Sequence, residues 1–120
     1  MPIAEQWINQ DTYTSIWTGE ISNTDLYHCL QRMRDSLCAH DDDKLDLILD
    51  ISGADNIPFD APYMTLRSGV LTRHNTGRVV IIGRTIWAQL MADIVQKVTH
   101  GDVIFVPSQK VAMEYLAERL

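Results

Sequence analysis

Side chains that could act as nucleophiles, general bases or metal ligands are scattered along this sequence. There is no Gly-x-Ser-x-Gly elbow, and no Ser, Cys or Thr lies beside a His in a predicted loop. The glycine-rich loops that bind nucleotide phosphates are also missing. No Cys/His spacing indicates zinc, and the acidic run 41–43 lacks the alternating ligands and the glycine of a calcium loop. We therefore predict no catalytic residue, no metal and no cofactor, and the chain is not expected to be an enzyme.

The histidines and cysteines have structural interpretations. His40, His74 and His100 lie close to predicted helix C-termini, where a cation is favoured, so we interpret them as capping residues. Cys29 and Cys38 lie nine residues apart in one predicted helix. At about 100° per residue they point to opposite sides, so we predict two reduced thiols.

Length, charge and hydropathy place the chain among soluble single-domain proteins. Its 120 residues are enough for one core, and we expect one domain over 1–120. The net charge of −6 argues against a nucleic-acid surface, which needs clustered basic residues. No apolar run is long enough to span a bilayer, and the start has no signal-peptide pattern. A cytoplasmic protein is therefore expected.

Hydrophobic periodicity predicts alternating strands and helices. Leu45, Leu47, Leu49 and Ile51 alternate with more polar residues, as in an interior strand. The order β-β-α-β-α-β-α-β-α indicates an α/β sandwich whose sheet is mostly parallel after a first hairpin. The expected strands are 4–9, 12–19, 44–52, 77–83 and 102–107, and the expected helices are 22–40, 60 to about 73, 84–101 and 108–120.

Helix signals also predict which faces are buried. Ser22 with Asp25 three residues later resembles a capping box. After a loop over 53–60, Asp60 is a suitable N-cap, and Pro62 fits the first helical turn. The inward face of the second helix is expected to hold Tyr63, Leu66, Val70 and Leu71. The third helix, capped by Thr85 and ended by Gly101, is expected to bury Ile86, Trp87, Leu90, Met91, Ile94, Val95 and Val98.

The carboxyl ends of the parallel strands form the default place for a ligand or partner. In sheets of this kind, the loops that leave those ends meet at one edge beside helix N-termini. A site for phosphate alone is disfavoured, because the carboxylate of Asp60 would repel it. The candidate edge residues are Ser22, Asn23, Ser52, Asp60, Tyr63, Arg84, Thr85 and Ser108.

Four stretches, in order along nearly the whole chain, resemble the STAS domain. This is the fold of bacterial anti-sigma-factor antagonists and of SpoIIAA-like domains. The stretches are "TGEIS" at 18–22, "LILDISGA" at 47–54, "GRVVIIG" at 77–83 and "VIFVPSQKVAMEYL" at 103–116. The resemblance implies a mixed sheet with about four helices packed mainly on one face. It also implies a non-enzymatic signalling module that binds a switch kinase or another protein at the strand-to-helix edge.

The same resemblance implies a phosphorylatable turn, and here this sequence departs from the family. The family's D-S-S-G turn falls on 60–63, where Ala61 and Pro62 replace both hydroxyl residues and Tyr63 replaces the glycine. Ser22 also stands where the family has an acidic residue. Thr65 and Ser68 lie further along the helix, and phosphorylation there is left open. We expect a divergent SpoIIAA-like module without the usual phosphoswitch.

Two functional hypotheses follow. The first is a module that binds a protein partner, or itself, through the candidate edge. The second is a carrier or sensor of a small apolar ligand or lipid, because some relatives share the broad architecture of SEC14-like domains. Its pocket would be lined by Trp17, Phe59, Trp87 and Phe105.

Overall fold

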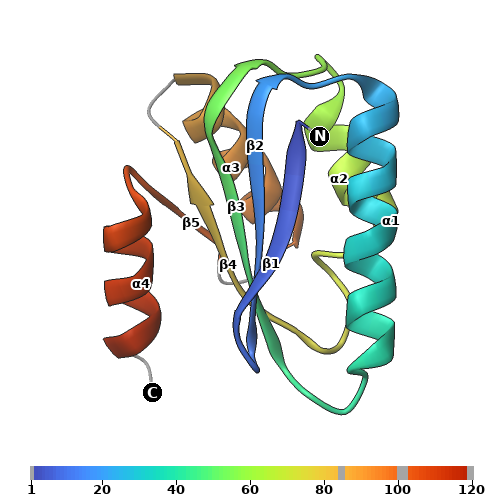
Figure 1. Ribbon diagram of the computed structural model, residues 1–120, viewed down its shortest axis with the longest axis vertical. Coiled ribbons are helices and arrows are strands. Elements are labelled where there is room, and N and C mark those ends of the chain that lie inside the picture. Colours follow the sequence, from blue (N-terminus) through green and yellow to red (C-terminus); the bar gives the residue numbers. More distant parts are fainter. Residues whose placement is uncertain (1, 84–85, 100–102, 119–120) are drawn as a thin grey trace.

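Five strands and four helices lie within the part of the chain that the structure describes (Figure 1). The computed structural model describes residues 2–83, 86–99 and 103–118. The strands are β1 (Ile3–Asn9), β2 (Thr12–Glu20), β3 (Leu45–Asn56), β4 (Thr76–Ile82) and β5 (Val103–Val106). The helices are α1 (Asn23–Ala39), α2 (Ala61–Ser68), α3 (Ile86–Thr99) and α4 (Gln109–Glu118).

The strands form one mixed sheet in the order β1-β2-β3-β4-β5. β1 pairs with β2 in antiparallel fashion, with Ile3 opposite Trp17, and every later neighbour pair is parallel. The predicted element order and the mostly parallel sheet are therefore confirmed. None of the described helices has the length and apolar character needed to cross a membrane.

Alternation along the strands creates two cores, one on each face of the sheet. Leu47 and Leu49 of β3 point into the larger core, together with buried residues of α1, α2 and α3. Ile48, between them, packs on the other face with Ala112 and Leu116 of α4. Figure 1 shows α1 and α4 on opposite sides of the sheet. Three of the four described helices thus share one face, as the resemblance to the STAS domain implied.

β3 is longer than predicted. The segment expected to begin a loop continues as strand through Asn56, because it keeps pairing with the end of β2. Gly53 lies opposite Thr18, and Asn56 opposite Glu20. β4 pairs with β3 only as far as Asp50, so 51–56 forms a two-stranded ribbon with β2 beyond the body of the sheet.

α2 is shorter than predicted. It ends at Ser68, because Gly69 adopts a left-handed conformation with φ of 81° and its N–H bonds to the carbonyl of Leu66. Val70 and Leu71 are buried, as expected, but they follow the helix. The prediction that Tyr63 faces inward is wrong, since it is 63% exposed. The inward residues of α2 include Ala61 and Thr65.

The predicted buried stripe of α3 is also wrong in part. Leu90 is 54% exposed, and Ile94 is exposed as well. Ala92, which lies about 200° around the helix from Leu90, packs in the larger core instead. Thr85 and Gly101, the predicted ends of this helix, lie outside the described residues.

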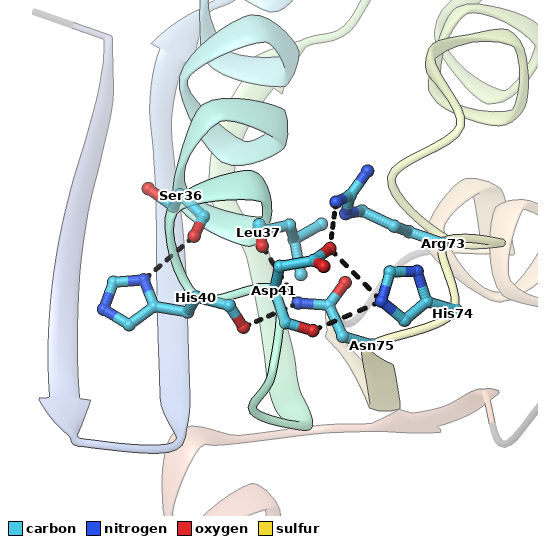
Figure 2. A network of polar contacts seen from close by, with 7 residues as sticks. All are labelled: Ser36, Leu37, His40, Asp41, Arg73, His74 and Asn75. Carbon is cyan, nitrogen blue, oxygen red and sulfur yellow. Dashed lines mark hydrogen bonds and ion pairs between the residues drawn. The ribbon is translucent and has the colours of Figure 1, made fainter.

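A polar network ties the loop before β4 to the end of α1 (Figure 2). The side-chain amide of Asn75 donates to the carbonyls of Leu37 at 2.9 Å and His40 at 3.0 Å. Asp41, the first residue of the acidic run 41–43, forms an ion pair with Arg73, and its carboxylate lies 3.2 Å from the His74 Nε2 atom. His40 is the C-cap of α1, as predicted. His74 has no such role, because α2 ends six residues before it.

Candidate functional site

The first part of the candidate edge is the start of α1. The Ser22 hydroxyl accepts a hydrogen bond from the Asp25 N–H at 3.0 Å, and the Asp25 carboxylate accepts one from the Ser22 N–H at 3.1 Å. The predicted capping box is therefore confirmed. The bond from the Ser22 backbone, and then its side chain, lowers the pKa of Asp25. Ser22 is thus committed to the helix start, while Asn23 after it is exposed.

The ribbon of β2 and β3 forms the second part of this edge. Ser52 lies within β3 rather than in a loop, and its side chain is exposed. Its hydroxyl and its N–H both donate to the Asp50 carboxylate, at 2.6 and 3.1 Å. The N–H of Ile21 donates to the carbonyl of Asn56 at 2.9 Å, so the chain segments that lead into α1 and α2 are joined by their backbones.

The start of α2 is the third part. Asp60 occupies the N-cap position, as predicted, but its side chain makes no capping hydrogen bond. The turn is held by the backbone, because the N–H of Ala61 donates to the carbonyl of Pro58 at 3.0 Å. Pro62 lies in the first helical turn, where its missing N–H costs nothing. The backbone hydrogen bond and Pro62 are sufficient to begin the helix, and no side-chain hydroxyl group is needed.

Two aromatic side chains stand in solvent beside this helix start. Phe59 is 97% exposed, and Tyr63 follows four residues later on the outer side of the first turn. The guanidinium of Arg67 lies over the Tyr63 ring, 6.0 Å from its centroid. Two large aromatic side chains are therefore left in solvent within four residues at this helix start.

Comparisons with solved structures identify the architecture. An uncharacterized protein of the DUF3478 family from Shewanella loihica PV-4, with a SpoIIAA-like fold, matches 95% of this chain and 91% of its own, at a TM-score of 0.70 and 20% identity. The unphosphorylated anti-sigma factor antagonist SpoIIAA matches 96% of this chain and 97% of its own, at a TM-score of 0.69 and 10% identity. The fold is SpoIIAA-like. No family model and no curated protein sequence matches the chain.

In this SpoIIAA-like fold, the hydroxyl groups next along α2 are turned into the helix. Thr65 is buried and donates to the carbonyl of Ala61 at 2.8 Å. Ser68 is half-buried and donates to the carbonyl of Thr65 at 2.6 Å. Both side chains therefore satisfy backbone carbonyls, and neither is presented at the N-terminal end of α2.

The residues predicted to line a ligand pocket do not come together. Trp17 is 1% exposed in the larger core, where its indole N–H donates to the Ser15 hydroxyl at 2.9 Å. Phe59 stands in solvent, whereas Phe105 is partly buried against the core. The side chain of Trp87 lies outside those that the structure describes. A residue sealed in the core and one almost wholly in water cannot line the same cavity, so this prediction is wrong.

The predicted edge residues are brought together only in part. Ser22 and Asn23 begin α1, and the ribbon joins this helix start to the segment that ends at Asp60 and Tyr63. Ser108 caps α4, since its hydroxyl accepts a hydrogen bond from the Val111 N–H at 3.3 Å, and α4 packs on the opposite face of the sheet. Arg84 and Thr85 lie outside the described residues.

Sequence reasoning treated Phe59 as a pocket residue and missed its exposure. It stands between Pro58 and Asp60, both turn-forming residues, and that context could have indicated a surface position.

Two buried titratable groups, Tyr13 of β2 and Cys29 of α1, lie in the core between this helix and the sheet. Burial, and to a lesser extent the nearby Glu5 carboxylate, raises the pKa of Tyr13 to about 12. Burial also raises the pKa of Cys29 to about 11, although the Ser15 hydroxyl, 3.3 Å from its sulfur, acts in the opposite direction. The Glu5 carboxylate on β1 forms an ion pair with the Arg32 guanidinium on α1 at 2.8 Å. A thiol with a raised pKa is a weak nucleophile, so Cys29 is a packing residue.

Proposed function

We propose that the chain is a non-catalytic STAS-type regulatory module that binds a protein partner without a phosphoswitch. The observation that carries the proposal is the exposure of Phe59 and Tyr63 at the start of α2. Leaving a phenylalanine side chain in water forgoes about 2 kcal/mol relative to burying it. A partner that covers both rings recovers that free energy, and aromatic anchors of this kind dominate many protein interfaces.

The chemistry of the α2 start supports the absence of a switch. Ala61 and Pro62 have no hydroxyl group, and Thr65 is buried with its hydroxyl bonded to a backbone carbonyl. A kinase would have to unfold this part of α2 to reach Thr65. We therefore propose that occupancy of the edge is controlled by the supply of partner and not by phosphate.

Affinity capture with matched variants tests this proposal. The tagged full chain and a Phe59→Ser/Tyr63→Ser variant are incubated with lysate of the cells that express it, and bound proteins are quantified by mass spectrometry. Val111→Ser, an exposed apolar position on α4, is the control. We expect the double variant to lose a partner that wild type and control both retain. Equal recovery by all three proteins would count against the edge.

A further inference from the structure

A groove between α1 and α2 combines apolar and cationic side chains. It has a volume of about 440 Å³. On α1, the lining residues are spaced as one helical stripe, and on α2 they follow the same i, i+3, i+4 pattern. The lining residues are Tyr27, Leu30, Gln31 and Arg34 from α1, and Met64, Arg67 and Ser68 from α2.

The floor of this α1–α2 groove is apolar and its rim is aromatic. Leu30 is buried and Met64 is half-buried, so both offer hydrocarbon surface at the bottom. Tyr27 is 58% exposed on one wall. Methionine adapts its shape to different apolar partners, and tyrosine offers a large contact area at low entropic cost. The α1–α2 groove can therefore hold apolar side chains of a second molecule.

The charges of the α1–α2 groove are of one sign. Arg34 and Arg67 are both exposed, one on each helix. Within 2–83, 86–99 and 103–118, the other three arginines are all ion-paired, whereas these two have no carboxylate partner. None of the described lining residues is acidic. A net charge of −6 for the whole chain makes this local positive pair a departure from the rest of the protein.

We infer that the α1–α2 groove binds an acidic amphipathic segment of a protein partner. Carboxylates of that segment meet Arg34 and Arg67, while its apolar side chains cover Leu30 and Met64. Arginine suits this role because its planar guanidinium binds a carboxylate through two hydrogen bonds and is weakly hydrated. The inference rests on the proposed function and names the chemistry of the partner.

Selection from a phage-displayed random-peptide library on the full chain tests this inference. We expect the selected peptides to combine Asp or Glu with Leu, Ile or Phe. The Arg34→Glu/Arg67→Glu variant should bind the best peptide at least about tenfold more weakly in fluorescence anisotropy. Lys97→Glu/Lys110→Glu, which lowers the net charge equally at exposed sites on α3 and α4, should bind within about twofold of wild type.

Several outcomes would overturn the inference. They are a library that yields no acidic enrichment, and equal binding by wild type and the arginine variant. If Arg34→Glu/Arg67→Glu does not fold by circular dichroism, Arg34→Gln/Arg67→Gln replaces it and should still weaken binding. Arginine-dependent binding to phosphatidylglycerol vesicles without peptide selection would indicate a lipid surface instead. Arginine-dependent dimers in sedimentation velocity would indicate a second copy of the chain.

The same variants separate this inference from the proposed function. Peptides that depend on Phe59 and Tyr63 but not on the two arginines would leave partner binding intact and refute the acidic segment. Peptides that depend on the arginines alone would support the α1–α2 groove and remove the exposed aromatic pair from the interface.

Discussion

Replacing Asn75 by alanine should detach the end of α1 from the loop before β4. Asn75 is 3% exposed, and its amide donates to two carbonyls at that helix end, Leu37 and His40 (Figure 2). Both carbonyls keep a second partner, since Leu37 also accepts from the N–H of His40 and His40 from the N–H of Asp43. The variant therefore removes two hydrogen bonds but orphans neither acceptor.

The magnitude follows from these contacts. Two hydrogen bonds contribute about 2 kcal/mol in total. The Asn75 Oδ1 atom is buried and has no hydrogen-bond partner in the described structure, so deleting it recovers about 1 kcal/mol. Asn75→Ala should thus lower the free energy of unfolding by about 1 kcal/mol, with a matching fall in melting temperature of about 3–6 °C.

Asn75→Asp should be worse at neutral pH, because a carboxylate replaces the donor and faces two carbonyl oxygens. We expect a loss of at least about 3 kcal/mol. Burial without a donor raises the folded-state pKa of such a carboxyl above its unfolded value. The penalty is therefore full above the folded pKa and disappears as the pH falls below the unfolded value near 3.9.

Urea unfolding followed by tryptophan fluorescence, to which the buried Trp17 contributes, measures both variants. Asn23→Ala is the control, at an exposed asparagine whose side chain forms no hydrogen bond with the described residues, and it should change stability by less than about 0.5 kcal/mol. The reasoning fails if Asn75→Ala matches this control. It also fails if the difference between Asn75→Asp and Asn75→Ala does not shrink as the pH is lowered.

Three further predictions follow from single residues. Cys38 is exposed, whereas burial raises the pKa of Cys29 to about 11. Ellman's reagent at pH about 8 should therefore react with one thiol in the native protein and with two in denaturant. Two fast-reacting thiols in the native protein would contradict this prediction. Gly69→Ala should lower the free energy of unfolding by about 1–2 kcal/mol in urea, because the φ of 81° at this position disfavours any side chain, even though there is open space for one. An unchanged urea midpoint would refute this backbone strain. Arg78 pairs with Asp46 at 2.9 Å and donates a hydrogen bond to the Leu116 carbonyl of α4. Arg78→Met should therefore lower the free energy of unfolding by about 2 kcal/mol and speed amide hydrogen exchange in α4. Unchanged exchange in α4 would contradict the link between Arg78 and this helix.

The sequence predicted the fold well where a local pattern and a tertiary demand agree. The alternation from Leu45 to Ile51 matches the two-core sheet, and Ser22 with Asp25 forms the expected capping box. Prediction failed where the length of a strand depends on the strand that pairs with it. The continuation of β3 through Asn56 depends on the end of β2, which no pattern within 53–56 reveals.

The helix faces show a second limit. On α3, Leu90 and Ile94 have helical spacing, yet the sheet packs against the side that carries Ala92. The rotation of a helix about its axis depends on its neighbours, and a small residue permits the close approach that an apolar count does not predict. The same limit hid the exposure of Tyr63.

The sequence predicted where in the fold the candidate site lies, but not which side chains form its surface. The carboxyl ends of the strands gave the start of α2, including the missing hydroxyl groups at Ala61 and Pro62. The α1–α2 groove joins residues more than 30 positions apart, such as Tyr27 and Met64, so only the packing of the two helices reveals it.

The two helices of the α1–α2 groove are fastened at opposite ends. Near their N-termini, the bond from Ile21 to Asn56 joins the segments that precede α1 and α2. Beyond their C-termini, Asn75 holds the loop after α2 against the end of α1. These hydrogen bonds at both ends restrict movement of the two helices away from each other. The conformational entropy lost on binding should therefore come mainly from the partner chain. The rate of association should then be limited by encounter with the partner and not by opening of the groove.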